Sequence, residues 1–492
     1  MAIDKSFDPY RRSPETAQEP PHNLAGALLR IGPGLILTGG IVGTGELIAT
    51  THVGAKAGFA LLWLVVLSCF IKVFVQIELG RYAISSGETT LRSLRALPKV
   101  GVLLVWWWLI MVAVTQTQVG AMVGGVGQAL YLAAANVSGT GADENATPTN
   151  TDGDGDASQG RPELPWAALV ALVTAVLVGT GSYRIVQYVT TALVIVFTFM
   201  TVACVIMLRA TDRAFGWTEV ASGFTFQLPP EALMAAFAMI GITGVGATEL
   251  ITYPYWCIEK GYARYVGPRS DSSDWQRRAQ GWLRVMHVDA WAAMVLYTIS
   301  TLAFYLLGAA VLFGDTEGRG LPGNISGMLE TLAGMYEPVM GRQGALWFIV
   351  VGAFATLYST LFAGAAGTAR MLTDFLWVNG FIRLSSQRDR LRWVRGFGMC
   401  LPFTSLLLFI QIADPTLMVT IGGLIQAVTL PVIGAASLFL RYRRTDRRLM
   451  PGMVWDMFLW VSVLVLLGAA LYGGFTQMGK LLPSATTACL SW

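Results

Sequence analysis

The chain contains 492 residues, of which 54% are hydrophobic and only 13% charged, and its mean hydropathy is +0.56. This composition is too apolar for a soluble enzyme of that length and is typical of a protein embedded in a bilayer. The formal net charge is only +4. Because no phosphate-binding Gly-Lys loop, nucleophile elbow or zinc-ligand spacing occurs, the sequence favours neither an enzyme nor an ATP-driven pump, and it does not indicate nucleic-acid binding.

Apolar segments of about twenty residues recur along the chain, and this is the length that crosses about 30 Å of hydrocarbon as a helix. We expect eleven spans, at about 30–50, 58–82, 102–134, 164–181, 185–208, 232–257, 289–313, 344–368, 397–412, 416–440 and 453–476. The sequence therefore predicts an all-α, multi-pass integral membrane protein surrounded by lipid.

Lys and Arg residues are concentrated in alternate loops, as expected when they remain on the cytoplasmic side of a membrane. Their distribution predicts a cytoplasmic N-terminus and, because eleven is an odd number of spans, an external C-terminus. Either inside-positive anchoring or specific binding of anionic lipid can explain five arginines that follow the tenth span: Arg441, Arg443, Arg444, Arg447 and Arg448.

Two segments, in the first and sixth expected spans, read almost alike: Gly43–Thr50 and Gly246–Tyr253. Each places a glutamate, Glu46 or Glu249, where a carboxylate costs several kcal/mol unless it faces a cavity or a partner. Glycines surround both motifs, and a glycine destabilises a helix interior by about 0.5–1 kcal/mol relative to alanine. We expect both helices to unwind there, although the glycines could instead serve close helix packing.

The positions of the two motifs predict an internal repeat. With the eleventh span set aside, the motifs lie in the first span of two sets of five, and an odd number makes the second set enter the membrane from the opposite side. This is the inverted-repeat plan of LeuT-like transporters. The expected divisions are a cytoplasmic tail at 1–29, repeats at 30–231 and 232–440, and a basic loop, eleventh helix and external tail at 441–492.

An acidic loop at 135–163 is expected outside the membrane. Four of its residues occupy the first, third, fifth and twelfth positions of an EF-hand-like calcium loop: Asp152, Asp154, Asp156 and Glu163. Ala157 stands where that loop requires glycine, and flanking soluble helices are absent. A solvated, disordered loop is the favoured interpretation, and calcium binding is the alternative.

The two glutamates would bring up to four carboxylate oxygens to the crossing of two broken helices. Together with carbonyls freed by unwinding, these hard ligands suit magnesium, calcium or manganese. Because close carboxylates repel, a proton can replace the cation in an empty site, which offers a route to proton coupling. The candidate substrate site is Glu46, Glu249, Gly43, Ala247 and Thr248, with broken backbone at Gly45 and Gly246.

A lysine near the centre of the second span, Lys72, must find a counter-ion or shed its proton. Glu78 lies on a different side of the same helix, so the expected partner is Glu46 or Glu249. Snorkelling toward water and direct contact with a substrate are the alternatives. A fixed positive charge would also fit transport without sodium, because it could take the place of a coupling ion. Lys72 and Glu78 are the candidate coupling or ion-pair residues.

Short runs along most of the chain match one known pattern: Gly32-Pro33-Gly34, Gly43-Thr44-Gly45-Glu46, Gly54-Ala55, Gly58, Leu61-Leu62-Trp63, Gln76, Arg81, Gly246-Ala247-Thr248, Ser359-Thr360 and Leu430-Pro431. Together they resemble the Nramp (natural resistance-associated macrophage protein-like) metal-transporter family. The resemblance implies a LeuT-like fold of eleven or twelve spans that works by alternating access.

The chain departs from this family at the metal ligands. The family's Asp-Pro-Gly-Asn becomes Gly43-Thr44-Gly45-Glu46, and its Met-Pro-His becomes Leu250-Ile251-Thr252. Ala247, a backbone-carbonyl ligand in the family, matches, whereas the third span has Gln116 and Gln118 in place of carboxylates. Related branches without the Met are associated with magnesium, in agreement with the hard ligands.

We therefore expect a secondary-active transporter of a divalent cation, with magnesium or manganese favoured over iron. The alternative is a small organic solute, such as an amine or an amino acid, held at the same breaks. A membrane receptor or sensor would need a soluble output domain, and no segment is long enough to form one.

Overall fold

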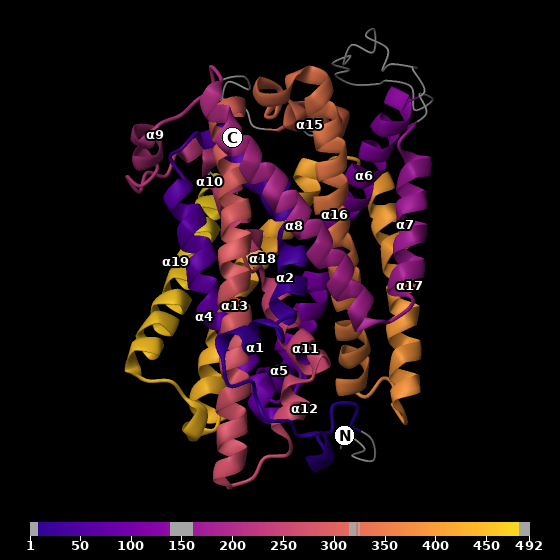
Figure 1. The fold of residues 1–492 in the computed structure, drawn as a ribbon, viewed down its shortest axis with the longest axis vertical. Coiled ribbons are helices and arrows are strands. Elements are labelled where there is room, and N and C mark those ends of the chain that lie inside the picture. Colours follow the sequence, from indigo (N-terminus) through magenta and orange to yellow (C-terminus); the bar gives the residue numbers. More distant parts are fainter. Residues whose placement is uncertain (1–7, 138–160, 314–320, 323–324, 482–492) are drawn as a thin grey trace, which may run out of the picture.

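The computed structural model describes residues 8–137, 161–313, 321–322 and 325–481. All of their regular elements are helices, and the long ones run side by side (Figure 1). Short helices cover both ends of the bundle. One end, which we call the N-terminal face, carries α1 (Leu24–Leu28), α5 (Thr90–Arg95) and α12 (Tyr262–Val266), and the other carries α9 (Trp217–Ser222) and α15 (Ile325–Gly334).

Nine apolar segments among the described residues are long enough to cross a membrane, and a bent pair makes up to ten. The helices involved are α2 (Pro33–Ile41) with α3 (Thr51–Ala57), α4 (Leu62–Ser86), α6 (Gly101–Val137), α8 (Tyr183–Met207), α10 (Leu233–Ile242) with α11 (Ala247–Lys260), α13 (Ser273–Leu307), α16 (Glu337–Val378), α17 (Gln387–Ile412), α18 (Pro415–Arg443) and α19 (Met453–Leu481). The prediction of an all-α membrane protein is confirmed.

The fourth expected span, 164–181, is shorter than predicted. It forms α7 (Leu164–Val178), whose 15 residues give a length of about 22 Å, less than the hydrocarbon core of about 30 Å. The helix ends there because Gly179 and Gly181 follow, and Gly181 adopts a left-handed φ of +68°. α7 packs against α6 and α17, so it completes the bundle without meeting the length of a full span.

α2 lies in the middle of the bundle and packs against α8, α11, α13 and α16 (Figure 1). Its glycines permit this close approach, because a β-carbon on Gly34 would lie 2.6 Å from the Asp289 carbonyl oxygen and one on Gly39 would lie 2.6 Å from Thr190 Cβ. Both interpretations of the glycine-rich first span therefore hold. The early glycines serve packing, and the later ones accompany the break.

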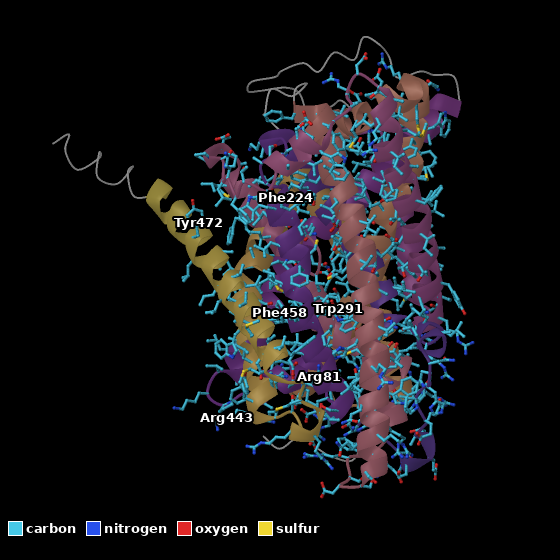
Figure 2. The ribbon with its side chains drawn as sticks, turned by 60° about the vertical axis from the view of Figure 1, so that its left-hand side comes forward. Arg81, Phe224, Trp291, Arg443, Phe458 and Tyr472 are labelled. Atoms are coloured by element: carbon cyan, nitrogen blue, oxygen red, sulfur yellow. The ribbon has the colours of Figure 1, made fainter. Side chains whose placement is uncertain are left out.

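α19 stands at the margin of the bundle, against α4 and α18 (Figure 2). Phe458 faces inward and stacks on Phe74 of α4, with ring centroids 5.1 Å apart, whereas Tyr472 lies farther along the helix and is 52% exposed. An exposed apolar surface of this kind is expected where a helix faces lipid. α19 corresponds to the eleventh expected span.

The alternative calcium site in the acidic loop falls mostly outside the described residues, since Asp152, Asp154 and Asp156 are not among them. Glu163 is described, and its carboxylate pairs with Arg161 at 3.0 Å.

Candidate functional site

The first span is interrupted between α2 and α3. α2 ends at Ile41, a wider-wound helical turn follows at Thr44–Thr50, and the two parts of the span are bent by 44°. Gly43 lies at the bend, and a β-carbon there would overlap the side chain of Thr360 on α16. Only glycine lets the chain pass α16 so closely, which accounts for Gly43 in the motif.

The sixth expected span is interrupted at the matching place. α10 ends at Ile242, α11 begins at Ala247, and Gly244 between them has a left-handed φ of +64° that glycine adopts without strain. The two breaks touch: a β-carbon on Gly45 would lie 3.3 Å from the Ile242 carbonyl oxygen, and the hydroxyls of Thr50 and Thr243 are 3.1 Å apart. The structure thus brings the two repeated motifs together.

Glu46 joins the two breaks through its carboxylate, and its side chain is fully buried. Oε1 accepts hydrogen bonds from the Gly244 amide at 3.3 Å and from the Thr301 hydroxyl at 3.1 Å, and Oε2 accepts one from the Gly43 amide at 3.4 Å. All three donors are neutral. Backbone amides freed by the breaks therefore provide the positive partial charge that a cation would otherwise provide to this carboxylate.

Lys72 binds carbonyl oxygens, contrary to the expected ion pair. Its ammonium donates to Ile240 O at 2.5 Å and to Thr243 O at 2.7 Å, at the C-terminal end of α10. These are carbonyls that helix termination leaves unpaired, and the negative end of the helix dipole favours a cation there. Among the described residues no ion pair joins Lys72 to Glu46 or Glu249, so the predicted direct pair does not form in this structure.

Glu249 lies at the start of α11 and is half-buried. Its Oε2 and the side-chain oxygen of Gln426, on α18, both face Gly246, at 2.5 and 2.7 Å from the position that a β-carbon would take. Gln426 also accepts a hydrogen bond from the Thr248 amide and donates one to Gln118 on α6. The buried Thr248 hydroxyl has no hydrogen-bond partner among the described residues.

Gln426 and Gln118 therefore belong to the site, although the sequence did not identify Gln426 and treated Gln118 only as a missing carboxylate. The signal was available, since an amide side chain inside an apolar span is costly unless it is hydrogen-bonded. Cys69 was also missed. Its thiol lies 3.2 Å from the β-carbon position of Gly244, but a cysteine in an apolar span carries no such signal.

Glu78 belongs to a different cluster, nearer the N-terminal face. Its carboxylate pairs with Arg81 and with Arg441 of α18, each at 3.2 Å, and accepts a hydrogen bond from the Trp455 indole. Arg441 is only 1% exposed and also pairs with Asp456. Thus Glu78 forms ion pairs, though remote from Lys72, and Arg441 contacts protein rather than lipid.

The crossing of the two breaks offers mainly oxygen atoms to a substrate. No group of three or more His, Cys, Asp or Glu side chains that could hold a metal ion occurs among the described residues. The oxygen atoms at or beside the crossing are those of Glu46, Glu249, the Gln426 amide and carbonyls of the broken backbone. Such a mixed set suits a cation that keeps part of its hydration shell.

Comparison with known proteins gives the same architecture. The structure of a manganese transporter from Eremococcus coleocola, solved as a mutant, is 16% identical, with a TM-score of 0.65 over 94% of this chain and 89% of that one. Mhp1, a nucleobase-cation-symport-1 family transporter, is 14% identical, with a TM-score of 0.58 over 96% of both chains. MhsT, solved with L-phenylalanine, is 16% identical, with a TM-score of 0.53 over 92% of this chain and all of that one.

These likenesses establish the LeuT-like fold. Among curated proteins, none matches the sequence significantly. The family model described as natural resistance-associated macrophage protein-like matches residues 34–476, which include both broken spans and nearly all of the bundle. The chain therefore belongs to the Nramp family of membrane transporters and is not an enzyme.

Proposed function

We propose that this protein is a secondary-active transporter of a divalent metal cation, bound where the two broken helices cross, with magnesium or manganese preferred to iron. The observation that carries the proposal is the Glu46 carboxylate, which is buried and bridges the amides of both breaks. A bound cation would take these oxygens as ligands. The family membership and the manganese transporter of the same fold support it.

The same contacts suggest how binding is linked to movement. When a cation withdraws Glu46 from the Gly43 and Gly244 amides, each buried N–H that loses its partner costs about 1–3 kcal/mol. The breaks relieve that cost by separating, which changes the angle between the halves of each span. Alternating access follows if the two angles change together. We propose the N-terminal face as the cytoplasmic side and two inverted repeats at 30–231 and 232–440.

The preference among metals rests on the ligand atoms. Glu46, Glu249 and Gln426 provide oxygen, which magnesium and manganese favour. The Cys69 thiol beside Gly244 is the nearby exception, and it would add affinity for a soft ion such as cadmium. Cys69→Ser should therefore reduce competition by cadmium and leave magnesium uptake unchanged. Loss of magnesium uptake in that variant would contradict the oxygen-based preference.

An organic solute with an amino and a carboxyl group is the second candidate. One observation favours it: the amides of Gly43 and Gly244 already hold a carboxylate, that of Glu46. A substrate carboxylate could take these amides while Glu46 turns to the substrate amine. This arrangement uses only groups that are already present at the site.

Uptake into proteoliposomes decides between the two. We expect Mg²⁺ or Mn²⁺ to enter, and Glu46→Gln and Glu249→Gln each to reduce uptake at least tenfold, a loss of about 1.4 kcal/mol. The exposed Glu231→Gln is the matched control. An internal pH dye tests whether protons move with the metal. If alanine or putrescine is taken up while Mg²⁺, Mn²⁺ and Fe²⁺ neither bind nor enter, the substrate is the organic solute and not the metal. If both variants take up the metal as the parent does, the two glutamates do not belong to the substrate site.

A further inference from the structure

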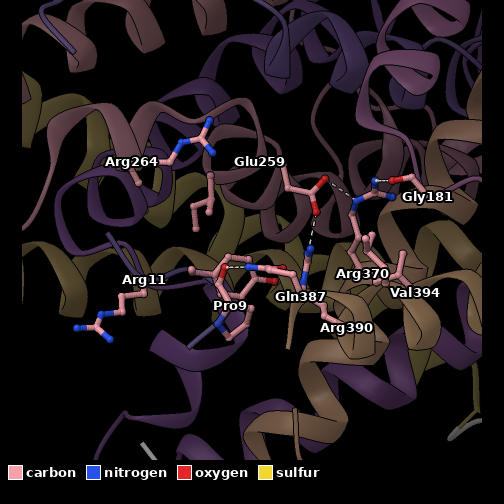
Figure 3. A pocket seen from close by; sticks show the side chains of 13 residues that line it. Pro9, Arg11, Gly181, Glu259, Arg264, Arg370, Gln387, Arg390 and Val394 are labelled. Carbon is pink, nitrogen blue, oxygen red and sulfur yellow. Dashed lines mark hydrogen bonds and ion pairs between the residues drawn. The ribbon is translucent and has the colours of Figure 1, made fainter. Parts of the chain in front are cut away.

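A cavity of about 390 Å³ opens on the N-terminal face, at the far end of α11 from its break (Figure 3). Its walls come from the N-terminal segment, α11 and α12, α16 and α17, which are distant in sequence. No residue proposed for the substrate site lines it. The volume lies in the range of about 300–1,000 Å³ that is usual for small-molecule sites.

Two buried arginines form the inner wall and share one carboxylate. Arg370 of α16 pairs with Glu259 of α11 at 2.8 Å, and Arg390 of α17 pairs with the other oxygen of Glu259 at 2.7 Å. Arg370 also donates to the carbonyl oxygens of Ala366 and Gly181. Glu259 thus fixes both guanidinium groups in place, as the dashed lines in Figure 3 show.

Two further arginines line the cavity opposite this pair, Arg11 of the N-terminal segment and Arg264 of α12. Both are exposed, and among the described residues neither has a side-chain hydrogen bond or ion pair. The lining therefore carries four guanidinium groups and one carboxylate, a formal charge of +3. Asp374 adds one negative charge behind Tyr10, but Thr89 and Tyr255 hold its carboxylate. Positive charge still exceeds negative charge.

We propose that this cavity binds a phosphate group, either that of a soluble phosphorylated molecule or that of an anionic lipid headgroup. A guanidinium donates two parallel hydrogen bonds to a phosphate, which makes arginine the usual residue for such sites. Arg11 and Arg264 supply the unoccupied donors, and Arg370 and Arg390 supply a fixed positive wall. The cluster of Arg370, Glu259 and Arg390 is enough to join these helices, and Arg11 and Arg264 add positive charge beyond it.

A phosphate in this cavity would connect the moving and fixed parts of the transporter. Glu259 and Arg264 belong to the half of the sixth span beyond its break and to the helix after it, whereas Arg390 belongs to α17. The N-terminal segment already crosses this face: Arg12 donates to Ser85 O and Ser86 O, and Gln387 donates to Pro9 O. The ligand would hold this end closed and slow transport. That consequence rests on the proposed function, but binding itself does not.

The test is a binding measurement on the full-length protein. Inorganic pyrophosphate is titrated by calorimetry into protein in an uncharged detergent, and phosphatidylglycerol or phosphatidylcholine is added for native mass spectrometry. We expect saturable binding of pyrophosphate, or retention of phosphatidylglycerol in preference to phosphatidylcholine. The double variant Arg11→Gln/Arg264→Gln should weaken that binding at least tenfold. Arg388→Gln is the matched control, because Arg388 is an exposed arginine of α17 outside the cavity.

Each outcome decides the matter. Binding of pyrophosphate assigns the site to soluble phosphates, and selective retention of phosphatidylglycerol assigns it to lipid headgroups, provided the double variant loses it. If neither probe binds, or if the double variant binds as the parent does, the proposal is wrong. Slower uptake with the bound probe would support the closing role. Normal binding without any uptake would leave the phosphate site standing and contradict only the proposed function.

Discussion

Charged groups at the centre of this transporter are held differently from those near its N-terminal face. At the centre, Glu46 accepts hydrogen bonds from neutral donors, and Lys72 donates to neutral carbonyls. Near the face, Glu259 and Glu78 each lie between two arginines. The central charges are held by backbone that the helix breaks have freed, and in the proposed mechanism they exchange partners when the breaks move. The paired charges cannot separate cheaply, and they fix helices to one another.

This comparison predicts that the face clusters matter most for stability. Glu259→Gln leaves Arg370 and Arg390, at 2% and 8% exposure, without their counter-ion. Removing one partner of a buried pair costs about 3–5 kcal/mol. We expect the largest fall in the thermal unfolding midpoint of the protein in detergent. Glu231→Gln, on the surface, is the control, and an equal midpoint for the two variants would break the comparison.

Lys72→Met tests the central arrangement and should have an intermediate effect. It removes the ammonium from Ile240 O and Thr243 O, and a buried acceptor left unpaired costs about 1–3 kcal/mol. Removal of a buried charge offsets part of this cost. The unfolding midpoint should fall less than in Glu259→Gln, while uptake is lost because the end of α10 is no longer held. The exposed Lys99→Met is the control.

A greater loss of stability in Lys72→Met than in Glu259→Gln would show that the centre, and not the face, fixes the bundle. Unchanged uptake in Lys72→Met would mean that the lysine has no part in the cycle. Rescue by Lys72→Arg is not expected, since the planar guanidinium is larger and cannot be placed as a point charge between two carbonyls.

Most of the fold followed from the sequence, because spans and breaks are local properties. Apolar length predicts a membrane helix, and the glycines of the motifs predict where backbone hydrogen bonding fails. α7 was overestimated because its apolar run continues through Gly179 and Thr180, where the helix has already ended. The hydropathy of a segment does not indicate where its helix ends.

The partners of the charged residues did not follow from the sequence, because they depend on how helices approach one another. Lys72 donates hydrogen bonds to carbonyl oxygens, because α4 passes the end of α10 where the break exposes them. Arg441 was expected beside the lipid headgroups, yet Asp456 of α19 pairs with it. A charged residue can be located on a helix from sequence, whereas its counter-ion comes from tertiary packing.

The smallest expected effect concerns Asp446, which lies in the loop after α18 and outside the spans. Arg448 donates to its carboxylate from the side chain and the backbone, and Arg269 lies 3.0 Å away; these contacts, the Arg448 side chain foremost, lower the pKa of Asp446 from 3.8 to about 2. A pKa lowered by folding means that the ionised carboxylate stabilises the fold above pH 4. That contribution is lost as the pH falls from about 4 toward 2. Because the Arg269 side chain is 62% exposed and that of Arg448 is 27% exposed, solvent screens these pairs and the effect is slight.

We therefore expect Asp446→Asn to lower the unfolding midpoint slightly and by a constant amount between pH 8 and pH 5. The difference from the parent should shrink as the pH falls below 4, because the parent then loses the same charge. Asp212→Asn, which removes an exposed carboxylate elsewhere, controls for the change in net charge. A difference that persists undiminished at pH 3 would show that Asp446 acts through packing and not through its charge. A fall as large as that of Glu259→Gln would mean that loop ion pairs fix the bundle as firmly as buried ones.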